Sequence, residues 1–192
     1  CQKCARKTTE TGVSVKVCDN CRKLALYFDR AWAGYAYAGT VKEIIHNFKY
    51  KNRIELGKLL SRLMLDFAKD YHLPLDSCDY IIPIPLSPAK LREREFNQAK
   101  ILAENAAECF GLQLLDNNLR RIRNTQSQTE LDKHKRWENV QGAFALKRPE
   151  AIKEKAVLLI DDVFTTGATA SEAARVLKSA GASSVFVLTV AN

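Results

Sequence analysis

Residues 157–169 have the sequence VLLIDDVFTTGAT, and this stretch decides the fold. Its first four residues are apolar, as expected for a strand that is buried on both faces. Asp161 and Asp162 come next, at the carboxyl end of that strand, where open parallel sheets bind their ligands. The residues after them open a helix that we expect over about 169–180, and an apolar strand follows over 184–190. This β–loop–α–β order predicts a parallel sheet with a right-handed crossover.

The loop after the two aspartates predicts a phosphate site. Gly167 permits a tight turn and a close approach of the backbone to a ligand. Threonine hydroxyls and the free amides of the next helix would bind an anion, helped by the helix dipole. A ribose 5-phosphate suits this arrangement, with its phosphate on the amides and its hydroxyls on the carboxylates. The alternative is a plain strand–turn–helix in which Thr and Asp side chains cap the helix.

This stretch resembles the phosphoribosyl-pyrophosphate (PRPP) motif of type I phosphoribosyltransferases. In that family the paired acids contact the ribose hydroxyls and the loop holds the 5-phosphate. The resemblance implies a type I phosphoribosyltransferase-like α/β fold, a parallel sheet flanked by helices, and Mg²⁺ as a companion of bound PRPP. The implied PRPP- or phosphate-binding residues are Asp161, Asp162, Thr165, Thr166, Gly167, Ala168 and Thr169.

Four of the six cysteines form two CxxC pairs near the start of the chain: Cys1, Cys4, Cys18 and Cys21. The two residues inside each pair let both thiolates turn onto one ion, which is typical of a structural Zn²⁺ site. Disulfides are the alternative, but they suit secreted proteins, and the sequence shows no signal-peptide pattern. We therefore expect zinc to fold a small module over residues 1–30, before a larger domain over 31–192. Because the first residue is not a methionine, we also expect upstream sequence to be missing.

The larger domain alternates strands and helices. Periodicity predicts strands over 32–37, 80–86 and about 142–146, and amphipathic helices over 54–69 and 97–110. Gly111 follows the second of these helices and is expected to end it.

Composition and charge disfavour several classes of protein. Of the 192 residues, 46% are hydrophobic and 27% are charged, which allows a buried core and is unlike a disordered tail. No apolar run approaches the roughly 18 residues that span a bilayer, so we expect a cytoplasmic protein with no membrane span. The net charge of +8 favours a partner that bears phosphates. Residues 1–30 hold seven Lys or Arg against three acids and residues 117–137 hold six against two, so the remainder is close to neutral.

Further stretches resemble the ComF family of late competence proteins, which are phosphoribosyltransferase-like and have an N-terminal zinc ribbon. They are the cysteine pairs, IPIPLS at 82–87, REREFNQAKILA at 92–103, RIRNTQSQTEL at 121–131 and RWENVQGAF at 136–144. The family usually has glycine where this chain has Glu95. The resemblance implies a role in natural transformation, the uptake of single-stranded DNA into the cytoplasm, beside a helicase-like competence partner.

Basic side chains are expected to bind pyrophosphate or DNA. Two of them follow the proline-bounded strand, near where type I enzymes bind pyrophosphate. The others lie in the polar segment 117–137, which would close over a substrate as a mobile loop or track a DNA backbone. A solvated helix face is the plain alternative. The residues are Arg92, Arg94, Arg121, Arg123, Lys133, Lys135 and Arg136, and the aromatic residues that could stack on bases are Trp32, Tyr50, Phe96 and Trp137.

Two functions from different classes follow from these patterns. One is a DNA-uptake factor that binds single-stranded DNA and whose PRPP-type site holds a DNA phosphate, PRPP or a nucleotide. The alternative is an active type I phosphoribosyltransferase that uses Mg²⁺-PRPP and an unidentified acceptor. A docking module built on the zinc ribbon is a third hypothesis. The sequence identifies no catalytic residue.

Overall fold

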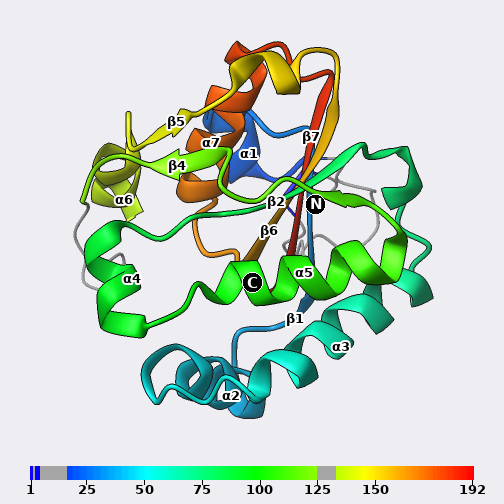
Figure 1. Ribbon diagram of the computed structural model, residues 1–192, viewed down its shortest axis with the longest axis vertical. Helices are drawn as coiled ribbons and strands as arrows, with labels where there is room; N and C mark the ends of the chain where they lie inside the picture. The colour runs from blue at the N-terminus through cyan, green and yellow to red at the C-terminus, as the bar shows by residue number, and fades with distance from the viewer. Residues whose placement is uncertain (2, 5–16, 125–132) are drawn as a thin grey trace.

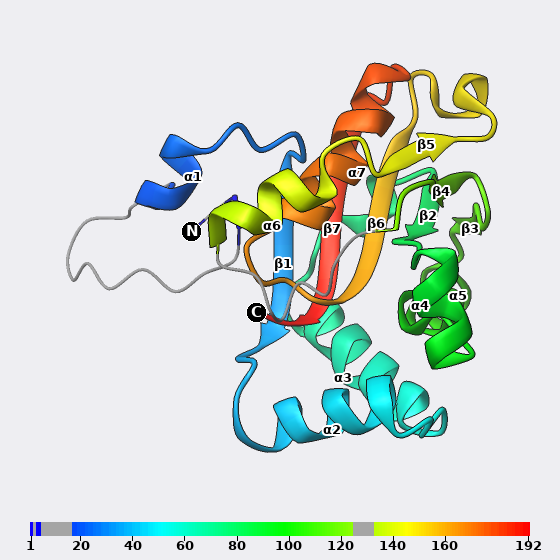
Figure 2. The same cartoon turned by 90° about the vertical axis from the view of Figure 1, so that its left-hand side faces the viewer.

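A computed structural model describes residues 1, 3–4, 17–124 and 133–192, and within them it confirms a parallel sheet flanked by helices. Figure 1 shows the whole chain. Its five parallel strands pair in the order β1-β7-β6-β2-β3, which can be followed in Figure 2. They are β1 (Arg30–Tyr35), β2 (Tyr80–Pro83), β3 (Gln113–Leu114), β6 (Ala156–Val163) and β7 (Ser184–Ala191). A short antiparallel pair is formed by β4 (Leu119–Arg121) and β5 (Phe144–Leu146).

Helices cover both faces of the sheet (Figure 2). The first face packs against α2 (Gly39–Tyr50), α3 (Leu56–Asp70) and α5 (Gln98–Phe110). The second packs against α7 (Ala168–Ser179) and, beside it, the cysteine-bearing N-terminal segment. The remaining helices are α1 (Asp19–Lys23), α4 (Pro88–Arg94) and α6 (Lys133–Val140), with 3-10 turns at Leu75–Ser77 and Pro149–Ile152.

Alternation along β6 sends its side chains into both layers. Val157 and Leu159 pack on the α7 face, whereas Leu158 and Ile160 pack on the face of α3 and α5, and all four are fully buried. The two faces explain the continuous apolar sequence. The same alternation directs the two following aspartates to opposite faces of the sheet.

The strand is longer than its apolar run. The sequence predicted that the two aspartates follow the strand, but β6 continues to Val163, because Asp161 pairs with Thr189 and Val163 with Ala191. The acids are therefore held by a paired strand rather than by a loop, and their positions are fixed by the sheet.

The chain reverses its winding between β2 and β6. From β6 it crosses to β7 through α7 on one face, and from β2 it reaches β3 through α5 on the other. Opposite crossovers from neighbouring strands leave a crevice at their carboxyl ends, which is where such sheets bind ligands.

The other predicted elements are present with small shifts. The strand expected over 32–37 is Arg30–Tyr35, the helix expected over 54–69 is Leu56–Asp70, and the helix after Asn97 is Gln98–Phe110. Gly111 adopts a left-handed conformation at φ +66° and ends that last helix, as predicted. No helix among the described residues is both long and apolar enough to cross a bilayer.

The N-terminal segment packs directly on the larger domain. Cys4, Cys21 and Phe28 belong to the same buried cluster as α7, and the backbone N–H of Ala31 donates to the carbonyl of Lys3 at 2.8 Å. The ring of Phe28 meets that of Phe164 edge to face, with 5.7 Å between centroids. A separate module over 1–30 stays a prediction, since the described part of this segment shares its core with the sheet.

Candidate anion-binding site

A pocket of about 770 Å³ opens at the carboxyl ends of β2 and β6, where the winding reverses. The loop after β2, the end of β6, the loop before α7, and helices α2, α4 and α5 contribute to its lining. Cations outnumber acids on its walls, with six Lys or Arg against three acids. The cations are Lys42, Lys49, Lys90, Arg94, Arg121 and Arg136, and the acids are Glu93, Asp161 and Asp162.

The two aspartates have different surroundings. Asp162 is buried, and its Oδ1 lies 2.7 Å from Nζ of Lys49, which reaches it from α2. Burial alone would lower the pKa of Lys49, but the ion pair outweighs burial and raises it. Burial and the neighbouring charge of Asp162 raise the pKa of Asp161 to about 7. One acid is therefore neutralised by the chain itself, and the other is partly protonated near neutral pH.

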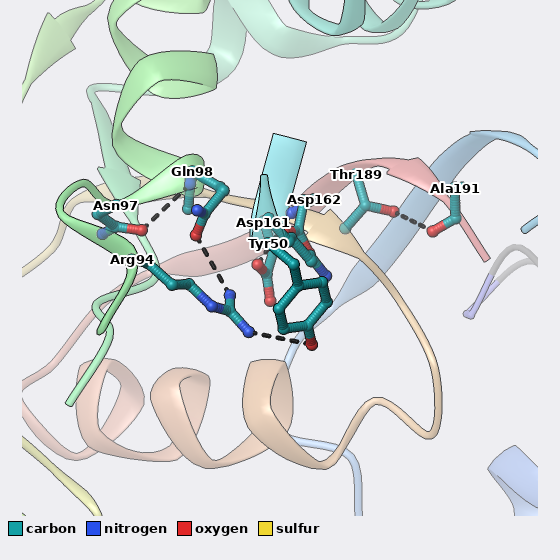
Figure 3. A network of polar contacts seen from close by, with 10 residues as sticks. Tyr50, Arg94, Asn97, Gln98, Asp161, Asp162, Thr189 and Ala191 are labelled. Atoms are coloured by element: carbon teal, nitrogen blue, oxygen red, sulfur yellow. Dashed lines mark hydrogen bonds and ion pairs between the residues drawn. The ribbon is translucent and has the colours of Figure 1, made fainter. Parts of the chain in front are cut away.

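Arg94 is fixed at the pocket wall by a small network (Figure 3). Its Nη1 donates to Oε1 of Gln98 at 3.2 Å, and its Nη2 donates to the hydroxyl of Tyr50 at 3.3 Å. The guanidinium carbon also lies 5.0 Å from the centre of the Tyr50 ring. Asn97 caps α5 by accepting from the N–H of Ala99 at 3.1 Å, and its side chain donates to the carbonyl of Ile84 at 3.1 Å.

Lys90 also lines the pocket, although the sequence patterns did not predict it as a site residue. It stands one helical turn before Arg94 on α4, so both side chains lie on the same face of that helix. Burial, then the charges of Arg121 and Arg94, lower the pKa of Lys90. Three cations that repel one another around a pocket favour the binding of an anion, because an anion would relieve their repulsion.

Glu95 occupies a backbone conformation that favours glycine. It ends α4 at φ +63° and ψ −24°, in the left-handed region. Its carboxylate accepts from the side-chain amide of Asn52, which is also at positive φ. The turn is thus made despite the glutamate, and it places Arg94 and Asn97 on either side of the bend.

The loop at residues 165–169 has the close packing that requires a glycine. Gly167 is at φ +83°, and a Cβ there would lie 2.7 Å from the ring of Phe164. The Thr166 hydroxyl accepts from the N–H of Ala168 at 3.3 Å, and the N-cap of α7 is Gly167. Thr165, Gly167, Ala168 and Thr169 line the pocket together with both aspartates.

The predicted basic residues divide into two groups. Arg94, Arg121 and Arg136 line the pocket. Arg92, Arg123 and Lys135 are not among the described residues that line it, and Arg123 instead donates to the carbonyl of Gln141. Thr166 of the predicted phosphate loop is also absent from the described lining. The side chain of Lys133 and the part of the polar segment over 125–132 lie outside the described residues.

Sequence reasoning missed the contribution of α2 to the pocket. Lys42, His46 and Lys49 of α2 line it, beside Tyr37 just before the helix. Nothing in their spacing marks them as site residues, because only tertiary packing brings α2 to β6. The position of Lys90 four residues before Arg94 is a signal that could have been used.

The four aromatic residues that could stack on bases differ in their exposure. Tyr50 is 45% exposed and lines the pocket. Trp32 was a wrong choice, because it is only 5% exposed and packs against Phe186 in the core. Phe96 is half-buried against Phe48, with 5.4 Å between ring centroids, and Trp137 is half-buried.

The four N-terminal cysteines form a compact cluster that could hold a metal. Their Sγ atoms all lie within 4.8 Å of one another. The Sγ atoms of Cys1 and Cys21 are 3.9 Å apart, and those of Cys4 and Cys18 are 3.7 Å apart. These spacings match the edge of about 3.8 Å in a tetrahedron with Zn–S bonds of about 2.3 Å, and they exceed a disulfide bond of about 2.05 Å. Burial and neighbouring thiols raise the pKa of Cys21, an effect that a bound cation reverses.

Comparison with solved structures finds two enzymes that are similar to part of this chain. The allosteric regulatory enzyme of purine biosynthesis matches 70% of this chain and 26% of its own, at 19% identity and a TM-score of 0.46. Glutamine PRPP amidotransferase from B. subtilis, complexed with ADP and GMP, matches 72% of this chain and 26% of its own, at 21% identity and a TM-score of 0.42.

Curated sequences give closer relatives. The chain is 28% identical to "Competence protein F" of Haemophilus influenzae over 96% of its length and 82% of the relative's. It is 29% identical to "DNA utilization protein YhgH" of Salmonella typhi, over 88% of this chain and 75% of that one. "Competence protein ComFC" of Streptococcus pneumoniae is 29% identical over 79% of this chain and 63% of its own. The chain therefore has homologues named for competence and DNA utilization, although no family model matches it.

Proposed function

We propose that this chain is a DNA-uptake factor of natural transformation that binds single-stranded DNA and has a phosphoribosyl or phosphate site at its pocket. The observation that carries the proposal is the joining of Asp161 and Asp162 with Lys90, Arg94 and Arg121 in one pocket. The cations suit phosphates, and the acids suit sugar hydroxyls. Homologues named for competence and DNA utilization support the biological role. From the ComF resemblance, we propose that the protein works in the cytoplasm beside a helicase-like partner.

Binding of a labelled oligothymidylate, measured by fluorescence anisotropy over a salt series, tests the DNA proposal. The logarithm of the association constant should fall linearly with the logarithm of the salt concentration, because bound cations release counterions from DNA. Unlabelled PRPP should displace the oligonucleotide if a DNA phosphate occupies the pocket. Binding that is absent, or that does not respond to salt, contradicts the proposal.

A matched pair of charge reversals locates the binding surface. Lys90→Glu changes a pocket cation whose charged neighbours are mostly cations, so it relieves repulsion and should leave the fold intact. Arg62→Glu makes the same change on α3, where the Arg62 side chain is 82% exposed. Lys90→Glu should weaken DNA binding by about tenfold more than Arg62→Glu. Equal losses would show that the pocket is not the DNA site.

An active phosphoribosyltransferase is the second candidate, and the presence of both aspartates beside residues 165–169 favours it. In such a reaction the bond from the sugar to pyrophosphate breaks and a bond to the acceptor forms. Lys90, Arg94 and Arg121 would stabilise the charge that develops on the departing pyrophosphate, and Asp161 the charge on the sugar. Pyrophosphate release with a panel of nucleobases, lost in Asp161→Asn, tests this candidate. Absence of turnover by folded, zinc-loaded protein would leave the pocket as a binding site only.

A further inference from the structure

Lys49 supplies a positive charge at the pair of aspartates, through its contact with Asp162. Its Nζ lies 2.7 Å from Oδ1 of Asp162, and the two side chains are only 16% and 8% exposed. The charge of Asp161 also acts on Lys49 from a distance, but the ion pair that the described residues show is with Asp162. Because Lys49 comes from α2 and Asp162 from the centre of the sheet, the contact is part of the packing of that helix.

This arrangement is a poor fit to a divalent metal ion. Mg²⁺ is bound by carboxylate and phosphate oxygens at ideal octahedral positions. Here one carboxylate is engaged by an ammonium group and the other is only partly ionised near neutral pH. A divalent ion at the acids would also meet the charge of Lys49 at close range, which costs free energy in a partly buried site.

The pocket supplies the positive charge that a phosphorylated ligand needs. Lys90, Arg94 and Arg121 face the same space from α4 and β4. The Nε atom of Arg94 is buried and has no hydrogen-bond partner among the described residues, although the other guanidinium nitrogens are used. A buried unsatisfied donor of this kind is costly, and a ligand oxygen could satisfy it.

We propose that Lys49 takes the place of a divalent cation in this pocket, so that PRPP binds here without Mg²⁺. The inference rests on the proposed function, because it assumes that the pocket takes a phosphoribosyl ligand. Asp161 then remains the carboxyl that is free of an ion pair with Lys49 and accepts from a ribose hydroxyl, while Lys49 holds Asp162 in place. Lys49 is in this sense a positioning residue.

Calorimetric titration of PRPP into the zinc-loaded protein tests the proposal, in buffer freed of magnesium by ion exchange and again with millimolar MgCl₂. The dissociation constant of the wild type should differ by less than about twofold between the two buffers. Lys49→Met should bind PRPP about tenfold more weakly without Mg²⁺ and recover when Mg²⁺ is added, and Lys49→Arg should behave as the wild type. Lys58→Met removes an exposed lysine of α3 outside the pocket lining and serves as the control.

The outcomes separate this inference from the proposed function. Wild-type binding that tightens tenfold or more with Mg²⁺ overturns the role of Lys49 but keeps the PRPP site. Absence of binding in both buffers overturns the PRPP site and the inference with it. The wild-type comparison needs no variant, so it decides the question even if Lys49→Met fails to fold.

Discussion

Lys49 and Asp162 form an ion pair in which Nζ lies 2.7 Å from Oδ1, and both side chains are largely withdrawn from water. Breaking such a pair leaves one buried charge without its partner, which costs more than the pair contributes. Lys49→Met should therefore lower the free energy of unfolding by about 3 kcal/mol. Adding Asp162→Asn to that variant should recover part of the loss, because the remaining charge is removed. Urea unfolding of the two single variants and the double variant measures the coupling, and additive losses would mean that the pair is weak.

Asp161 should give the protein a distinctive pH dependence. Its pKa is raised to about 7 in the folded state, so the folded protein holds a proton that the unfolded chain loses near pH 4. The free energy of unfolding should therefore fall as the pH rises from about 4 to 7, by up to about 4 kcal/mol from this group. Asp161→Asn keeps the Oδ1 that accepts from the N–H of Asp162 and removes the titration.

Thermal unfolding of both proteins across this pH range provides the measurement. A loss of metal from the cysteine cluster in acid would affect both proteins alike, so the difference between their curves isolates Asp161. The wild type should lose stability relative to Asp161→Asn as the pH rises. Parallel curves would show that Asp161 titrates as an ordinary carboxyl.

The loop before α7 should tolerate only glycine at position 167. Gly167→Ala must accept a positive φ and also a Cβ that lies 2.7 Å from the Phe164 ring. Gly39→Ala shares the positive φ, but its Cβ would meet nothing within 4 Å. We expect a loss of about 1 kcal/mol for Gly39→Ala, and a loss at least about 1 kcal/mol larger for Gly167→Ala. Chemical denaturation compares the two, and equal losses would mean that the Phe164 ring moves aside freely.

The cysteine cluster should hold one zinc ion per chain. Cys18→Ser removes one of four thiols that lie within 4.8 Å of one another, so it should lower the zinc content and the melting temperature. Cys109→Ser changes a half-buried cysteine of α5 outside the cluster and should keep the zinc. Elemental analysis of both purified variants measures this. A wild type without metal, or with disulfides among the four thiols, would contradict the zinc assignment.

Sequence patterns predicted the sheet and the acid pair because these depend on local order. An apolar run buried on two faces, two acids and a glycine loop are adjacent in the chain, so their proximity needs no knowledge of the fold. The lysines and arginines that line the pocket were predicted less well. Charge runs pointed to residues 117–137, yet in that segment only Arg121 and Arg136 line the pocket among the described residues. Lys42, Lys49, Lys90 and Arg94 come from the part of the chain with almost no net charge.

The contact between Lys49 and Asp162 could not be predicted from the sequence, for a physical reason. Lys49 reaches Asp162 only because α2 packs across the end of β6, and that packing depends on buried residues such as Ile45 and Phe48 rather than on Lys49. A charge run reports where cations are dense along the chain, whereas a pocket collects single cations from several elements. The glutamate at position 95 was noticed as a departure from the family pattern, but its consequence required the backbone angles.

Glu95 provides a test of that backbone conformation. Glu95→Gly and Glu95→Ala remove the same charge and the same hydrogen bond from Asn52, so they differ only in the Cβ. At φ +63° a residue with a Cβ costs roughly 1 kcal/mol more than glycine. Glu95→Gly should therefore be about 1 kcal/mol more stable than Glu95→Ala in urea unfolding. If Glu95→Ala is the more stable of the two, the turn after α4 does not hold the left-handed conformation in solution. Alanine would then be the more stabilising residue because its unfolded chain has a lower conformational entropy than that of glycine.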